Sequence, residues 1–298
     1  MASSCKIINK DCLSFFKSYK GREVDLTFLD PPFNQGKDYN HFDDKQSHDD
    51  YWNFILSVLE DTYRISKDGA GIYFMQREKN TQFVLSALEK SGWHLHNLII
   101  WKKMTSAVPC INKFSKSYQV IAYATKGKRP QTFNKLKISP PIPAHYKHER
   151  DGGIYITDVW DDIRELTAGY FASAEAIRND DNSRFHKQQA PIALLLRIIL
   201  SSSKVGDLIL DPFAGTGTTS VTALQLNRDS IGVEIDPNNV KCLKNRTSKV
   251  KAEDDISNLI NYYRYSEGLD DICGFDIDKM DEKSISKESH RNKELAFG

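Results

Sequence analysis

Residues 208–219 read Leu-Ile-Leu-Asp-Pro-Phe-Ala-Gly-Thr-Gly-Thr-Thr, and this stretch decides the fold. A short apolar run precedes a turn that contains Gly215 and Gly217, and a helix is expected from Thr218. Glycines at such a strand-to-helix turn let the backbone approach a ligand without obstruction by a Cβ atom. The stretch therefore favours a cofactor loop in an α/β fold, although the glycines alone are also compatible with a tight turn that binds nothing.

Two acidic residues beside this loop indicate the kind of cofactor. Glu234 follows the next apolar run, 19 residues after Gly215, where a carboxylate can accept hydrogen bonds from both hydroxyls of a ribose. Asp211 precedes the turn, and its charge is wrong for a pyrophosphate but suits the ammonium group of S-adenosylmethionine. No Gly-Lys-Ser/Thr sequence follows, so the loop is not a P-loop.

Apolar segments of strand type alternate with segments of helical spacing along most of the chain. This alternation predicts βαβ units and a parallel sheet. The expected strands are Val24–Leu29, Gly71–Met75, Leu98–Trp101, Gln119–Ala124, Leu208–Leu210 and Ser230–Val233. The expected helices are Tyr51–Ile65, Gln82–Glu89, Pro191–Ser202 and Thr218–Leu226, with a last helical turn within Leu259–Tyr265.

A second motif, Asp30-Pro31-Pro32-Phe33, directly follows the first of these strands. The prolines end the strand because proline donates no ladder hydrogen bond, and open α/β sheets bind ligands at the carboxyl ends of their strands. Asp30 and the carbonyl of Pro31 can each accept one N–H hydrogen bond from an exocyclic amine, while Phe33 stacks on the base. Such positioning suits direct in-line transfer to the amine. As an isolated tetrapeptide, the motif is equally compatible with a simple strand end.

The net charge of +1 conceals a basic segment from Lys113 to Arg150, in which Glu149 is the only acidic residue. A basic segment in a nearly neutral protein is a candidate surface for a polyanion, or else a solvated lysine-rich loop. We expect phosphate contacts here and base readout from Tyr146–Arg184. The expected DNA-binding residues are Lys113, Lys116, Lys126, Lys128, Arg129, Lys135 and Lys137.

Together, and in this order, the two motifs resemble the bacterial DNA amino-methyltransferases of restriction–modification systems, in their β-group arrangement. Matching segments are IINKDC (Ile7–Cys12), NLIIWKK (Asn97–Lys103), DVW (Asp158–Trp160) and the run from His186 to Asp236. The resemblance implies an α/β, Rossmann-like S-adenosylmethionine-dependent methyltransferase fold, circularly permuted, with a central target-recognition insertion. One departure is His186-Lys187-Gln188-Gln189-Ala190-Pro191, where the family has His-Pro-Thr-Gln-Lys-Pro.

The resemblance also implies a role for each motif residue. Asp11 would lie near the adenine of S-adenosylmethionine, Glu234 would hold the ribose, and Asp30–Phe33 would bind a target base flipped out of the duplex. The residues around the methionine moiety would be Asp211, Phe213, Ala214, Gly215, Thr216, Gly217, Thr218 and Thr219. We expect the catalytic part of the domain at 1–125, target recognition at 126–185, the cofactor-binding part at 186–250 and an acidic extension at 251–298, with little order from about Gly268.

The expected activity is sequence-specific methylation of adenine N6 in double-stranded DNA, because Asp before Pro-Pro is typical of adenine enzymes in this group. Three alternatives stay open: N4-cytosine methylation by the same fold, methylation of an RNA base or a protein amide, and DNA binding by an inactive methyltransferase fold. A restriction endonuclease and a second copy of the chain are possible partners.

Other features argue against further classes. The five cysteines form no CxxC pair, and His145, His148 and Glu149 complete no ligand set, so no metal site is expected. Pro109-Cys110 is followed by isoleucine, unlike the nucleophile of cytosine-C5 enzymes. The chain lacks a signal peptide and any apolar run of about 18 residues, which predicts a cytoplasmic, nucleoid-associated bacterial protein with no membrane contact.

Overall fold

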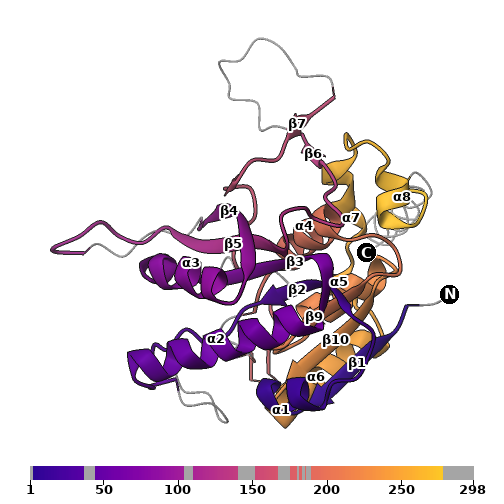
Figure 1. Ribbon diagram of the computed structural model, residues 1–298. Coiled ribbons are helices and arrows are strands. Elements are labelled where there is room, and N and C mark those ends of the chain that lie inside the picture. Colours follow the sequence, from indigo (N-terminus) through magenta and orange to yellow (C-terminus); the bar gives the residue numbers. More distant parts are fainter. Residues whose placement is uncertain are drawn as a thin grey trace.

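The computed structural model describes residues 3–36, 44–103, 110–139, 152–166, 175–179, 181, 182, 185 and 189–277. Its centre is an eight-stranded sheet in the order β1-β10-β9-β2-β3-β5-β4-β8 (Figure 1). The strands are β1 (Cys5–Asn9), β2 (Val24–Leu29), β3 (Ser66–Arg77), β4 (Trp93–Lys102), β5 (Tyr118–Lys126), β8 (Val159–Trp160), β9 (Leu208–Asp211) and β10 (Asp229–Glu234). A separate pair is formed by β6 (Lys137–Ile138) and β7 (Ile154–Tyr155).

Strands from the two ends of the chain interleave in this sheet. β1 pairs in parallel with β10, and β2 pairs in parallel with β9. The strand that carries the glycine loop thus lies beside the strand that carries Asp30, although 181 positions separate Asp30 from Asp211 in the sequence. This order confirms the predicted Rossmann-like, circularly permuted fold.

The predicted parallel sheet contains one antiparallel strand. β5 runs antiparallel between β3 and β4, with a register from Gly71↔Thr125 to Arg77↔Gln119. β4 and β5 follow each other in the chain and pair as a long hairpin, so the second strand must reverse direction. Consequently, the connection between β4 and β5 leaves the sheet at the edge where β3 ends.

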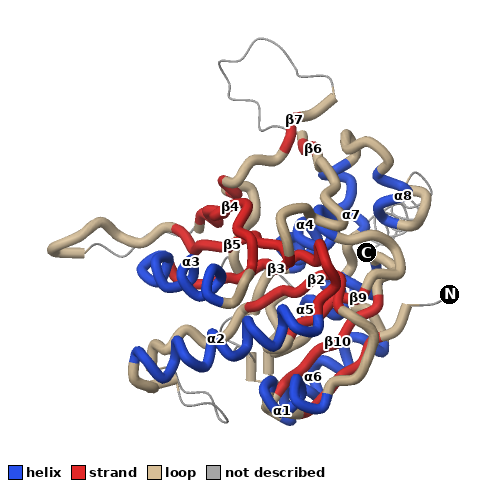
Figure 2. Tube along the Cα trace, in the orientation of Figure 1, coloured by secondary structure: helices blue, strands red, loops and turns tan. Residues whose placement is uncertain are grey.

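Helices cover both faces of the sheet (Figure 2). On one face, α1 (Cys12–Ser18), α2 (His48–Ile65) and α3 (Thr81–Lys90) bury apolar side chains such as Phe16, Ile55 and Leu88. On the other, α4 (Ile192–Ser202) and α5 (Thr218–Gln225) form the second core with the C-terminal segment. α6 (Pro237–Ser248) begins directly after β10, and Asp236 caps its first turn.

The C-terminal segment is more ordered than expected. α7 (Ser257–Ile260) and a 3₁₀ turn at Asn261–Tyr263 dock on the second core, as predicted. The expectation of little order from Gly268 is wrong for the next nine residues, because α8 (Leu269–Cys273) buries both of its terminal side chains. An apolar residue at every fourth position is enough to dock this segment, since each of these side chains reaches the core. Residues 278–298 lie outside the described part of the chain.

The loop after the tetrapeptide is held at both of its described ends. Both oxygens of the buried Asp44 carboxylate accept backbone hydrogen bonds, from Asn34 at 2.7 Å and from Gln35 at 2.9 Å. Ser47 caps α2, which begins at His48, three residues before the predicted start. Residues 34–36 and 44–50 are therefore held by side-chain hydrogen bonds and by the start of α2.

Some expectations fall outside the described residues. These are the candidate ligands His145, His148 and Glu149 and most of the Tyr146–Arg184 readout segment. In the described part of 126–185, β8 extends the main sheet beside β4. Across the described residues, none of the helices combines the length and the apolar character needed to cross a membrane.

Candidate active site

The glycine loop after β9 is fixed by packing and by one hydrogen bond. The N–H of Gly215 donates to Oε2 of Glu234 at 2.8 Å, which joins the loop to the end of β10. Gly217 has φ of 86° at the N-terminus of α5, and a Cβ atom there would meet Cγ of Leu243 at 2.4 Å. Gly217 is thus required by helix packing. Gly215 instead lines a cavity at the carboxyl ends of β2, β9 and β10, which we call the first cavity.

Asp211 lies at the floor of this cavity with only 4% of its surface exposed. The hydroxyl of Thr219 donates to Oδ2 at 2.5 Å, and the N–H of Phe213 donates to Oδ1 at 3.0 Å. Burial raises the pKa of Asp211 to about 7, and these two hydrogen bonds offset only part of the rise. A cationic group that entered the cavity would relieve this cost by stabilising the carboxylate.

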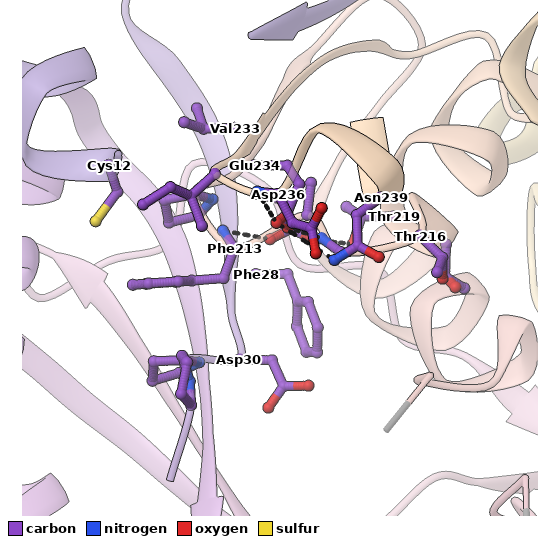
Figure 3. Close-up of a pocket in the computed structure, with 18 of the residues that line it drawn as sticks. Cys12, Phe28, Asp30, Phe213, Thr216, Thr219, Val233, Glu234, Asp236 and Asn239 are labelled. Atoms are coloured by element: carbon purple, nitrogen blue, oxygen red, sulfur yellow. Dashed lines mark hydrogen bonds between the residues drawn. The ribbon is translucent and has the colours of Figure 1, made fainter. Parts of the chain in front are cut away.

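Glu234 is the second acidic residue of the cavity, and burial raises its pKa as well. The N–H of Asp236 donates to its Oε1 at 2.8 Å, so the carboxylate is held at the end of β10. Figure 3 shows Glu234, Asp236 and Asn239 grouped together, with Asp30 well apart from them across the pocket. Paired carboxylate and amide oxygens at one end suit the hydroxyls of a ribose.

Asp11 also lines the cavity, from the N-terminus of α1. Its two oxygens accept hydrogen bonds from the N–H groups of Leu13 and Ser14, both at 3.0 Å. Burial opposes ionisation of this carboxyl, but the bonds from Ser14 and Leu13 outweigh burial and lower its pKa. The side chain therefore serves first as a helix cap, and it contributes a negative rim to the cavity.

The predicted cofactor residues come together in one cavity. All of them line it except Gly217. Apolar walls complete the site: the rings of Phe54 and Phe213 lie 6.1 Å apart in a T-shaped arrangement, and Val233 is buried beside them. Carboxylates at two positions and aromatic walls between them fit the ammonium, ribose and adenine of S-adenosylmethionine.

The tetrapeptide reaches the same cavity from the end of β2. Asp30, Pro31 and Pro32 line it, and Phe33 is buried behind them with 5% of its surface exposed. The hydroxyl of Tyr51 donates to the carbonyl oxygen of Pro32 at 2.7 Å. This hydrogen bond ties the turn to α2 at Pro32.

A second cavity adjoins the first at Asp30. Both cavities share Asp30, Gln189 and Ala190. The second one is lined further by Phe33, Met75, Trp101, Lys103, Gln119, Glu165 and Leu166. Asp30 therefore lies at the boundary between the first cavity, which suits a cofactor, and the second cavity, which suits a substrate. The aromatic side chains of the second cavity suit a planar ring.

Comparison with known proteins identifies the family of the chain. A family model described as DNA methylase, covering N6 and N4 methyltransferases, matches residues 24–245. The chain belongs to the N6/N4 DNA methylase family. S-adenosylmethionine is accordingly its methyl donor, and the cavity under the glycine loop offers the groups to hold it.

Individual relatives of this methylase are named as methyltransferases too. The DNA adenine methyltransferase YhdJ of Escherichia coli (strain K12) is 30% identical over 254 residues, covering 79% of this chain and 80% of YhdJ. Type II methyltransferase M.HpaI of Haemophilus parainfluenzae is 29% identical over 242 residues, covering 81% and 73%.

Two solved structures share the fold of the methylase. The PvuII DNA methyltransferase, described as cytosine-N4-specific, has a TM-score of 0.60 at 15% identity, with 91% of this chain and 94% of that one covered. The M1.HpyAVI–SAM complex has a TM-score of 0.57 at 21% identity, covering 82% and 100%. At these identities the likeness supports the fold alone.

The structure does not gather the predicted DNA-binding residues of the methylase at this site. Lys126 is the last residue of β5, and Lys128 and Arg129 follow it, at the end of the strand where Thr125 pairs with Gly71 of β3. The site lies at the other end of that register, at Gln119, roughly 20 Å away at about 3.3 Å of rise per residue. Nζ of Lys126 donates to the carbonyl of Ser66 at 2.7 Å, a local structural contact.

The remaining basic residues divide between two places. Lys135 follows Asn134, whose N–H donates to the carbonyl of Ser201 near the end of α4, and Lys137 pairs with Glu267 at 3.3 Å. Lys113 and Lys116, in contrast, belong to the β4–β5 connection, at the same sheet edge as Asp30. Lys116 there pairs with Glu78 at 2.8 Å.

Several residues of the site escape prediction from the sequence. Phe54 and Tyr51 come from α2, and no local pattern connects that helix to either motif. Asp236 and Asn239 follow Glu234 closely, so their place at the strand end could have been read from spacing. Lys103 and Glu165 complete the second cavity, and only Lys103 falls in a matching segment.

Proposed function

We propose that this methylase transfers a methyl group to the N6 amine of adenine at a specific sequence in double-stranded DNA. One observation carries the proposal: Asp30 borders both the cofactor cavity and the adjoining cavity with its aromatic walls. A base inside a duplex cannot reach a recessed carboxylate, so the adenine must be flipped out into the second cavity.

The chain's own groups then position the amine. The Asp30 carboxylate accepts one N–H hydrogen bond, and the carbonyl of Pro31 accepts the other, which leaves the amine lone pair directed toward the first cavity. Phe33 supplies an apolar face to the base. S-adenosylmethionine supplies an electrophilic methyl group on a sulfonium. The negative charge of Asp30 stabilises the positive charge that grows on the amine nitrogen during transfer.

The β4–β5 connection gives the DNA a surface beside this site. It projects from the body as an arm at the sheet edge where β3 ends (Figure 1). Its described part carries Lys113 and Lys116, and the side chains of Ile111 and Phe114 are almost completely exposed. Lysines bind phosphates, and exposed apolar side chains can pack on bases where a nucleotide has left the stack. We therefore place the duplex against this arm, with 126–185 as the target-recognition region.

Adenine is preferred over cytosine for two reasons. The tetrapeptide begins with aspartate, and the similar protein YhdJ carries the name of an adenine enzyme. The acceptors at Asp30 and Pro31 fit either amine, so identification of the methylated nucleoside decides between adenine and cytosine. A restriction endonuclease and a homodimer stay predictions.

Substitution of Asp30 tests the proposal. D30A should reduce methyl transfer to unmethylated DNA by at least about a hundredfold, because the amine loses both its positioning and its charge stabilisation. The dissociation constant for S-adenosylmethionine should stay within about threefold of wild type, as Asp30 lies at the boundary of the cofactor cavity. Full methyl transfer by D30A would remove this carboxylate from the mechanism.

A further inference from the structure

The second cavity is lined by a half-buried lysine, Lys103, that the transfer chemistry described above does not use. Lys103 directly follows β4, and its N–H donates to the carbonyl of Ser117 at 2.6 Å, which fixes the backbone at the base of the arm. Its side chain folds back so that Nζ lies 3.2 Å from the centroid of the Trp101 ring. The ammonium group is thus held inside the cavity, whereas its neighbour Lys102 is exposed.

Two segments that are distant in the sequence from Lys103 bring carboxylates to the cavity that holds this ammonium group. Glu165 approaches from the segment after β8, Asp30 from the end of β2, and both attract the charge of Lys103. Trp101 is itself anchored, because its indole N–H donates to the carbonyl of Ile163 at 2.8 Å. Burial lowers the pKa of Lys103 to about 8, although the carboxylates of Glu165 and Asp30 oppose the shift. The fold thus keeps a costly charge at one wall of the cavity.

The chemistry of this wall matches the edge of an adenine base. A lysine ammonium has three donors and no acceptor, so it seeks a lone pair. The exocyclic amine of adenine has such a lone pair beside it, on ring nitrogen N1, whereas guanine carries an N–H at the corresponding position and thymine carries one at N3. A donor in the same cavity as Asp30 therefore favours a base with a ring lone pair beside its amine, which adenine has at N1 and cytosine at N3, and it disfavours guanine and thymine.

We propose that Lys103 is a base-recognition residue, which donates a hydrogen bond from Nζ to the ring nitrogen next to the target amine. The face of Trp101 holds the ammonium group for this contact, and Glu165, which lines the same cavity, attracts its charge. The inference rests on the proposed function, because it requires the flipped base to occupy the second cavity. It adds to that function a group that favours an amine-bearing base over guanine and thymine, where Asp30 acts on the amine.

A thermodynamic double-mutant cycle tests the contact, in which one change removes N1 of the base and the other removes the ammonium group of Lys103. Duplexes with the methylated sequence would carry either adenine or 1-deazaadenine at the target, and kcat/KM for methyl transfer would be measured for wild type and K103M. Wild type should lose about tenfold or more on the deaza substrate, because one charge-assisted hydrogen bond disappears. K103M should show little further loss. The weaker pairing of the deaza base affects both proteins equally and cancels in the cycle.

Two controls allow the result to be interpreted. A duplex with 7-deazaadenine changes the opposite edge of the base and should be used equally well by wild type and K103M relative to adenine. K103Q retains an N–H donor and should keep part of the discrimination, which provides a second variant if K103M is poorly folded. An equal loss on 1-deazaadenine in wild type and both variants would overturn the contact. Failure of wild type to methylate unmodified adenine would instead refute the proposed function, before any analogue is used.

Discussion

The hydroxyl of Tyr51 donates a hydrogen bond of 2.7 Å to the carbonyl oxygen of Pro32. The side-chain amide of Gln76 donates to that same hydroxyl at 2.8 Å, and both Tyr51 and Gln76 are buried. One chain of hydrogen bonds therefore ties the catalytic turn to α2 and to the end of β3. The Pro32 carbonyl already accepts this hydrogen bond, and we assign the carbonyl of Pro31 as the acceptor for the target amine.

Loss of the Tyr51 hydroxyl should impair catalysis. Y51F leaves the Pro32 carbonyl and the Gln76 amide without their partner, which costs about 1–3 kcal/mol in a buried site. The turn then holds Asp30 less well, and we expect kcat to fall by about tenfold with the affinity for S-adenosylmethionine unchanged. Steady-state kinetics and equilibrium binding measure the two effects.

Tyr63 provides the matched control for that experiment. It lies on the same helix, near the end remote from the site, and its ring packs against Trp93. Y63F removes the same atom and should leave kcat unaltered. A similar fall of kcat in both variants would show that the Tyr51 effect comes from the stability of α2 and not from the turn.

Binding of S-adenosylmethionine should release a proton near neutral pH. Burial raises the pKa of Asp211 to about 7, so this carboxyl is largely protonated at pH 6 in the free protein. The ammonium group of the cofactor stabilises the carboxylate and lowers its pKa, which expels the proton on binding. Titration calorimetry at pH 6 in buffers of different ionisation enthalpy should report release of up to about one proton, decreasing toward pH 8.

The variant D211N assigns that proton. It removes the titrating group, so cofactor binding should become weaker and its enthalpy should no longer depend on the buffer through this carboxyl. Glu234 also has a raised pKa and gives a residual contribution. Undiminished proton release by D211N would place the titration elsewhere in the cavity.

The DNA surface can be located with two pairs of basic residues. Lys113 and Lys116 lie on the arm at the sheet edge of Asp30, whereas Lys128 and Arg129 lie near the opposite edge. K113E/K116E should weaken DNA binding by tenfold or more and reduce the salt dependence of the affinity, since each lost phosphate contact lowers the slope by about 1.

K128E/R129E changes the net charge of the protein by the same amount and should have a much smaller effect. Binding isotherms at several salt concentrations compare the two variants directly. A larger loss of affinity in K128E/R129E would move the duplex to the amino edge of the sheet and would revive the sequence-based assignment of those residues.

Features that depend on local sequence were predictable. The strand over Val24–Leu29 is found with the same bounds, because a β-branched run before two prolines permits little else. The glycine loop and Glu234 also meet as expected, since parallel strands bring their carboxyl ends to one edge. The predicted roles of the two glycines differ in the structure, because only Leu243, a residue of α6, shows that Gly217 is needed for packing.

Features that depend on pairing between distant segments were not predictable. Nothing in the composition of β5 reveals that it runs antiparallel, and that direction puts Gln119, and not Lys126, at the edge where Asp30 lies. The basic segment therefore looked continuous in the sequence but is divided in space. Tyr51, Lys103 and Glu165 illustrate the same limit, because each acquires a role only from its neighbours in the fold.

Nucleoside analysis of the product tests the central claim, that Asp30 joins a cofactor cavity to a cavity for a flipped adenine. Wild type and D30A would be incubated with labelled S-adenosylmethionine and unmethylated genomic DNA, and the modified nucleosides and their sequence context would be identified after digestion. We predict N6-methyladenine in one defined sequence with wild type and none with D30A. N4-methylcytosine as the sole product, or N6-methyladenine formed equally by D30A, would contradict the account.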